Sequence, residues 1–134
     1  MLAFRKYPGT VRILLLFFIA GFAIGTTTHI IDLITRGFIP NEAAPLCKNI
    51  YWSMLTLLDP LAIALIIWRL YPALGFSILI IVSDVLINTN MLRFDQFDPV
   101  ADYKIICQIA FCLYVLITTP IIVHLNQKSR KVIG

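Results

Sequence analysis

Charged residues are scarce in this chain. Asp, Glu, Lys and Arg make up 13% of its 134 residues, whereas hydrophobic residues make up 60%. Soluble domains are about one-quarter charged and about half apolar. The deficit excludes an ordinary soluble enzyme and a disordered binding segment. It also excludes a nucleic-acid binder, because the cations behind the net charge of +4 lie at the ends of apolar runs rather than in one stripe.

Common catalytic and redox motifs are absent as well. The three cysteines form no C-x-x-C pair, which disfavours a thiol oxidoreductase. The sequence contains no phosphate-binding loop, nucleophile elbow or Glu-x-x-His motif. An outer disulfide between Cys47 and Cys107 is one interpretation of the cysteines, and packing as small apolar residues is the other. No cofactor is expected, and an enzymatic activity is not the leading expectation.

What the sequence has in abundance is long apolar runs. A transmembrane helix needs about 20 mostly apolar residues, and the mean hydropathy of the chain is +0.90. The expected spans are residues 13–34, 50–68, 73–90 and 104–124. These runs lack the alternation of apolar and polar residues that is typical of strands in a transmembrane β-barrel. The sequence therefore predicts an all-α integral membrane protein, a four-transmembrane-helix bundle that forms a single domain over residues 1–134.

The cations predict the orientation of the bundle. One set of end segments and connections has no acid and carries seven cations: Arg5, Lys6, Arg12, Arg69, Lys128, Arg130 and Lys131. The opposite set mixes both signs: Arg36, Lys48, Arg93 and Lys104 with Glu42, Asp95, Asp98 and Asp102. Positive residues favour the cytoplasmic side. We therefore expect a multi-pass protein of the cell membrane with both termini in the cytoplasm.

Two segments near these ends need separate interpretation. Residues 1–23 have the form of a signal peptide, with a basic start and an apolar run. Polar residues continue beyond Ala23, which favours a retained first span. Residues 70–72 are expected to form a tight turn, so that the second and third spans make a helical hairpin.

Polar residues inside the spans are the candidates for function, because ionisable groups in a bilayer are costly. Helical spacing places them on faces that we expect to meet in the outer half of the bundle. The Gly21 and Gly25 pair permits close helix approach on the face that carries His29. The candidate ligand-binding or proton-carrying residues are Asp84, Asp59, His29, Asp32, Asn88, Trp52 and Tyr114.

Most of these residues also have a structural interpretation. Asp59 precedes a proline and could restore hydrogen bonding lost there. Asp32 lies four residues before Arg36 and could form an interfacial ion pair, and His29 could bond to a carbonyl of a neighbouring helix. Asp84 has no cation of its own helix in reach, so a purely structural role is least expected for it.

Three buried carboxylates cannot all be ionised cheaply in one cavity of low dielectric. Either one is neutral or a cation lies among them, namely protonated His29, a metal or a cationic ligand. His29 and Asp32 are weak metal candidates, because H-x-x-D is a pattern of low specificity, and no metal site is expected.

These residues favour a polar, acid-lined cavity in the outer half that binds a lipid-like or cationic amphipathic small molecule. The first alternative is a structural or immunity-type interaction protein whose polar core only specifies packing. Further alternatives are a proton- or cation-coupled transporter and a membrane enzyme that uses His29 and a carboxylate. The expected partners are the lipid bilayer and such a small molecule. Nucleic acid is not expected as a partner, and assembly into a homo-oligomer is a further alternative.

The combination of four spans, cytoplasmic termini, long outer connections and acids in spans one and two resembles the emopamil-binding and sigma-2-receptor type of membrane protein. The resemblance implies binding of sterol-like or cationic amphiphiles, and some members of that group isomerise sterols. Because it is a resemblance of architecture, it assigns no role to individual residues.

Overall fold

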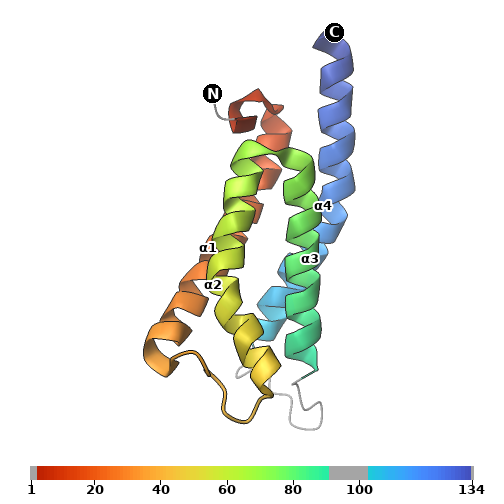
Figure 1. The fold of residues 1–134 in the computed structure, drawn as a ribbon. Coiled ribbons are helices and arrows are strands. Elements are labelled where there is room, and N and C mark those ends of the chain that lie inside the picture. The colour runs from red at the N-terminus through yellow and green to blue at the C-terminus, as the bar shows by residue number, and fades with distance from the viewer. Residues whose placement is uncertain (1–2, 91–102, 134) are drawn as a thin grey trace.

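The computed structural model is a bundle of long helices and describes residues 3–90 and 103–133 (Figure 1). The long helices of this described part are α1 (Gly9–Arg36), α2 (Leu46–Trp68), α3 (Leu70–Thr89) and α4 (Tyr103–Ile133). A short 3-10 helix, η1 (Ala3–Lys6), precedes them. Each helix contains one expected span almost completely. The prediction of an all-helical, four-helix bundle is therefore confirmed.

The helices pack in the order in which they follow one another. α1 contacts α2 and α4, and α3 contacts the same two helices. The two ends of the chain lie at one end of the bundle (Figure 1), which we call the terminal end. At the other end, here called the far end, α1 and α3 finish and α2 and α4 begin. The predicted orientation of these ends across the membrane stays a prediction.

The turn between the second and third spans differs from expectation. Leu70 to Pro72 do not form the turn but the first turn of α3, and only Arg69 separates the two helices. Arg69 adopts an extended conformation with φ −145° and ψ 102°. A proline fits the first turn of a helix, because its fixed φ is helical and its missing N–H needs no partner there. Pro72 therefore lies within the first turn of a helix where we expected it to precede one.

Three helices extend beyond the expected spans by four residues or more. α1 and α2 each begin four residues earlier, at Gly9 and Leu46, and α4 continues to Ile133, so that it projects from the terminal end (Figure 1). Lys128, Arg130 and Lys131 lie on this projecting part of α4. Of the charged residues expected at the far end, Arg93, Asp95, Asp98 and Asp102 lie outside the described residues.

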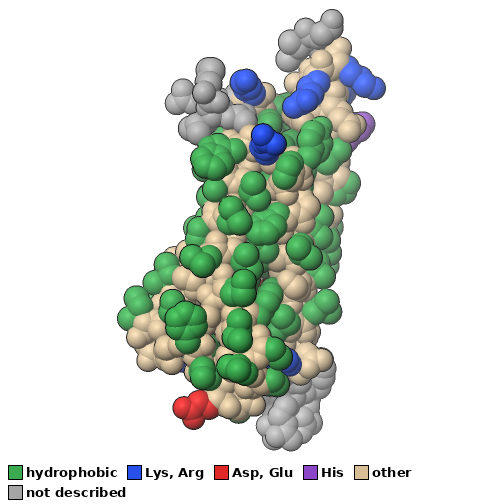
Figure 2. All heavy atoms as spheres, in the orientation of Figure 1, with side chains coloured by type: hydrophobic (Ala, Val, Ile, Leu, Met, Phe, Trp, Pro, Cys, Tyr) green, Lys and Arg blue, Asp and Glu red, His purple; other side chains and the backbone are tan. Residues whose placement is uncertain are grey.

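The surface of the bundle is apolar around its middle. In the most hydrophobic window of each helix, between 17% and 39% of the residues are buried inside the bundle. Hydrophobic side chains cover the visible middle, whereas Lys and Arg gather at the terminal end (Figure 2). All four helices are long and apolar enough to cross a membrane. The protein is therefore a multi-pass membrane protein whose outward apolar side chains suit a lipid bilayer.

The core is aliphatic and aromatic. Leu15, Phe18, Leu55 and Ile66 are among the largest completely buried side chains. Phe18 packs edge-to-face against the Phe111 ring, with centroids 6.5 Å apart, and thereby joins α1 to α4. This packing sets the relative positions of the helices that carry the polar candidates.

Candidate functional site

Asp84 is the centre of a hydrogen-bonded network between α3 and α4. Its Oδ1 atom accepts a 2.8 Å bond from the Asn88 amide, one turn further along α3. Its Oδ2 atom accepts a 3.0 Å bond from Gln108 Nε2 on α4. The Asn88 amide also donates to Gln108 Oε1 at 3.1 Å, so the three side chains form a closed triangle.

The network continues to α2 through an indole. Trp52 Nε1 donates to Asn88 Oδ1 at 3.0 Å. Asn88 is thus an acceptor on one side and a donor on the other, which sets its orientation. Hydrogen bonds to charged groups contribute about 1.5–3 kcal/mol each in soluble proteins. Asp84 therefore has partners that offset much of the cost of its burial, and the network ties α2, α3 and α4 together.

Gln108 is the member of this network that was not among the residues expected from the sequence. The signal was present, because Gln108 is a polar amide in an apolar run of the fourth span. The expectations for that span rested on ionisable groups and on the helix face that carries Tyr114. Gln108 shows that an uncharged amide can supply the missing partner of a buried carboxylate.

Asp59 lies in a different environment from Asp84. Its side chain is 4% exposed and belongs to α2, within which Pro60 follows it. Asp59 takes part in none of the hydrogen bonds among the described residues. The bond that could replace the one lost at Pro60 is therefore not among them. A carboxyl group that is buried without a partner is costly. Asp59 is therefore the intramembrane acid whose presence the packing of the described residues does not explain.

Two hydroxyl groups in the core also lack partners among the described residues. They are Thr56 Oγ1, three residues before Asp59 on α2, and Ser77 Oγ on α3. Thr56 and Asp59 lie one helical turn apart, so they share a side of α2. Native structures pair most buried polar groups with protein or with ordered water. This part of the core therefore has unused hydrogen-bonding capacity.

The side of α1 that carries the two glycines faces these residues. A Cβ atom added to Gly25 would lie 2.5 Å from Asp59 Oδ2, and one added to Gly21 would overlap the Phe111 ring of α4. The expectation that this face points into the bundle is met. The glycines make room for an acidic side chain and a ring, rather than for the backbone of a second helix.

His29 and Asp32 lie further toward the far end of α1, and both are partly exposed. Asp32 forms an ion pair with Arg36 at 3.8 Å, and the Arg36 side chain is 62% exposed. This exposed ion pair agrees with the interpretation of Asp32 and Arg36 as a pair at the membrane interface. His29 has no hydrogen bond to another described residue. The structure therefore does not bring either side chain into the Asp84 network.

Tyr114 lies away from the Asp84 network as well. Its hydroxyl donates to the Leu14 carbonyl at 2.9 Å, and its ring packs against Phe18. Leu14 belongs to the half of α1 nearer the terminal end. Tyr114 thus joins α1 to α4 through packing, and we place it outside the group formed by Trp52, Asn88 and Asp84.

In the described ranges, no three His, Cys, Asp or Glu side chains are grouped so that they could hold a metal ion. Cys47 and Cys107 are free and exposed, and Cys112 is free and buried. The interpretation of Cys47 and Cys107 as a disulfide pair therefore finds no bond in this structure.

The polar core is thus divided between a paired and an unpaired part. Asp84, Asn88, Trp52 and Gln108 satisfy one another. Thr56 Oγ1 and Ser77 Oγ are buried without a partner among the described residues, and Asp59 takes part in no hydrogen bond among them. Comparison of the chain with family models, with curated proteins and with solved structures finds no match.

Proposed function

We propose that this membrane protein binds a lipid-like or cationic amphipathic small molecule in the half of the bundle near the far end, with Asp59 as the counter-ion. We further propose that the termini face the cytoplasm, so that this half is the outer one. The observation that carries the proposal is Asp59, a residue that is 4% exposed and that takes part in no hydrogen bond among the described residues.

The cost of that burial is the physical argument. Removing a carboxylate from water costs several kcal/mol even after relaxation, and Asp84 offsets this cost through amide donors on two helices. Asp59 has no such donors. A cationic ligand would supply them, because an ammonium group carries both the opposite charge and N–H donors. Such a ligand would bind Asp59 in preference to Asp84, because the Asp84 carboxylate already has two amide donors.

Neighbouring groups support the same position. Thr56 Oγ1, one turn away on α2, is a second acceptor without a partner. Gly25 lies directly opposite Asp59, whose Oδ2 atom occupies the space that a side chain on the glycine would fill. The aromatic face of Trp52, held by Asn88, is suited to pack against an apolar or cationic ligand. His29 lies one turn beyond Gly25 and is the remaining candidate on α1.

The experiment is a binding titration with a fluorescent alkyl tertiary amine on the full chain in lipid nanodiscs. The uncharged alcohol with the same alkyl chain and fluorophore is the control probe. Asp59→Asn preserves the shape of the side chain but removes its charge. We expect it to weaken amine binding by tenfold or more and to leave binding of the alcohol unchanged, since one buried ion pair supplies the difference.

Asp32→Asn is the matched control variant. It removes the same charge from a residue that is partly exposed and already paired with Arg36, so amine binding should stay within about twofold. Equal affinity of the wild type and Asp59→Asn for the amine would contradict the proposal. So would the absence of any saturable binding of the amine to the wild type.

The second candidate function is a structural or interaction protein whose polar core only specifies packing. The satisfied network of Trp52, Asn88, Asp84 and Gln108 favours it, because such a network can determine which helices meet. In that case no small molecule co-purifies, and Asp59→Asn stabilises the bundle by removing an unpaired charge. Mass spectrometry of the lipids and metabolites that co-purify with the protein distinguishes the two functions.

A further inference from the structure

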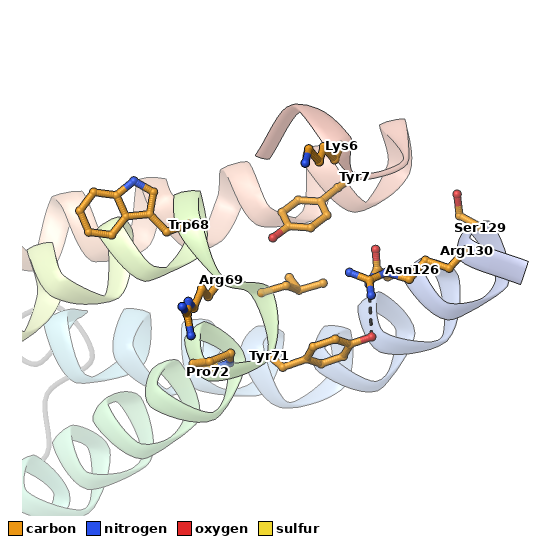
Figure 3. Close-up of a pocket in the computed structure, with 10 residues that line it drawn as sticks. Lys6, Tyr7, Trp68, Arg69, Tyr71, Pro72, Asn126, Ser129 and Arg130 are labelled. Atoms are coloured by element: carbon orange, nitrogen blue, oxygen red, sulfur yellow. Dashed lines mark hydrogen bonds between the residues drawn. The ribbon is translucent and has the colours of Figure 1, made fainter. Parts of the chain in front are cut away.

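A pocket of about 550 Å³ opens at the terminal end of the bundle, away from the acids discussed above (Figure 3). Three regions far apart in the sequence surround it: the segment from η1 to α1, the junction of α2 and α3, and the last turns of α4. The proposed function does not use this pocket. We call it the basic pocket.

The charged side chains that line the basic pocket all have the same sign. They are Lys6, Arg69 and Arg130, and no acid is among the lining residues. The ion pair that the described residues form, between Asp32 and Arg36, lies at the other end of α1. Three neighbouring cations repel one another unless an anion lies between them. The pocket therefore has a net positive field that the described side chains do not neutralise.

Neutral hydrogen-bond donors accompany these cations. Asn126 is 3% exposed, lines the pocket and donates from Nδ2 to the Tyr71 hydroxyl at 3.3 Å. Burial raises the pKa of Tyr7, while the Leu70 backbone and the Arg130 charge act in the opposite sense. Its hydroxyl therefore stays protonated at neutral pH and keeps a proton to donate. Together these groups suit a ligand that only accepts hydrogen bonds.

The pocket also lies at the depth expected for lipid headgroups. Trp68 and Tyr71 line it at the last turn of α2 and the first turn of α3, and aromatic residues at span ends are typical of the membrane–water boundary. Basic pockets between transmembrane helices at this level hold the phosphate groups of lipids.

We infer that the basic pocket binds a phosphate-bearing anion, held by Lys6, Arg69 and Arg130 with the Tyr7 hydroxyl and the Asn126 side chain as neutral partners. An anionic phospholipid presents this group from the bilayer, and free phosphate presents it from water. The chemistry of recognition is the same for both, and the cations exclude a positively charged amphiphile from this pocket. The ligand classes at the two ends of the bundle are thus opposite in charge.

The test uses the full chain in a neutral detergent and measures ligand retention by native mass spectrometry. The probes are dioleoyl phosphatidic acid, dioleoyl phosphatidylcholine and inorganic phosphate. We expect one equivalent of phosphatidic acid to bind in preference to phosphatidylcholine. Competition by millimolar inorganic phosphate would identify free phosphate as a sufficient ligand, whereas retention of phosphatidic acid in its presence would identify the lipid. If neither phosphatidic acid nor phosphate binds, the inference is wrong.

A pair of double variants separates the pocket from general attraction between opposite charges. Arg69→Gln with Arg130→Gln removes two pocket cations, and we expect phosphatidic acid to bind roughly fivefold more weakly for each cation lost. Lys128→Gln with Lys131→Gln removes two exposed cations from the same end that do not line the pocket. Its affinity for phosphatidic acid should stay within about twofold of wild type.

Equal weakening in the two double variants would overturn the inference, because the binding would then reflect overall charge. If Arg69→Gln with Arg130→Gln does not fold, as judged by circular dichroism, Lys6→Gln replaces it. Lys6 belongs to η1, outside the four long helices, and its loss should still weaken phosphatidic acid binding roughly fivefold. An unchanged affinity in that variant would equally overturn the inference.

Discussion

Asp59 on α2 faces Gly25 on α1 so closely that a single methyl group on the glycine would lie 2.5 Å from the carboxylate Oδ2 atom. The Asp59 side chain is 4% exposed, so it has little free space into which it could withdraw from such a methyl group. Gly25 is therefore part of the environment of the acid, and the two positions should respond to mutation together.

Gly25→Ala should destabilise the protein by about 1–3 kcal/mol, the usual cost of overpacking, because the Asp59 side chain must move. Thermal unfolding in detergent micelles measures the loss. Gly75→Ala is the matched control, since a Cβ there meets open space, and the better helix propensity of alanine should stabilise it by up to about 1 kcal/mol. If Gly25→Ala costs as much in an Asp59→Ala background as in the wild type, the two residues are not coupled.

Asp84→Asn should destabilise the bundle by about 1–3 kcal/mol, the cost of an unsatisfied buried group. The network needs two acceptors at this position, because amide donors of Asn88 and Gln108 each point at one oxygen. Asparagine would place an N–H group opposite one of them. Asp32→Asn, at a partly exposed site, should change stability by less than about 0.5 kcal/mol in the same unfolding assay. Equal losses in both variants would contradict the assignment of the network.

Asn49→Ala should loosen the connection between α1 and α2. Asn49 is completely buried, accepts a 2.9 Å bond from the Asn41 backbone N–H and donates to the Asn41 and Ala44 carbonyls. Hydrogen exchange followed by mass spectrometry should show faster exchange at residues 41–45 in this variant. Asn41→Ala removes only a local side-chain bond to Ala43, so its effect should be smaller. Slow exchange in both variants would show that other contacts hold the connection.

Cys47 reports the orientation of the bundle, because its thiol is free and exposed at the start of α2, near the far end. In a variant with Cys107→Ser and Cys112→Ser, a membrane-impermeant maleimide should label Cys47 on intact cells. Lys128→Cys in the cysteine-free chain, at the terminal end, should react only after permeabilisation. The reverse labelling pattern would show that the termini face outward and that the far end is cytoplasmic.

Much of the architecture follows from the sequence. In lipid, apolar runs of about 20 residues can form all their backbone hydrogen bonds only as helices or as strands of a closed barrel. Because apolar and polar residues do not alternate along these runs, barrel strands are excluded and helices are predicted. The spacing of Gly21 and Gly25 likewise predicted that their side of α1 faces inward. The prediction of a turn at residues 70–72 was wrong, since a proline fits the first turn of a helix as readily as the turn before it.

The contacts within the polar core could be predicted only in part. Helical periodicity correctly placed Asp84 and Asn88 on one face of α3, where the structure joins them by a hydrogen bond. It could not reveal that Gln108 reaches the same carboxylate from α4, because periodicity relates residues within a helix but not across two helices. For the same reason, the sequence suggested a structural role for Asp59 beside Pro60 and least expected one for Asp84, whereas the structure gives the amide partners to Asp84.

The sequence alone determined that this chain is a four-helix membrane protein with acids in its core and unbalanced cations at one end. The tertiary structure decided which acid is paired, which glycine faces the unpaired one, and that Lys6, Arg69 and Arg130 line one pocket. The physical reason is that composition and periodicity set how each helix meets lipid. The rotation of each helix against its neighbours, set by close packing of side chains, decides which polar groups meet.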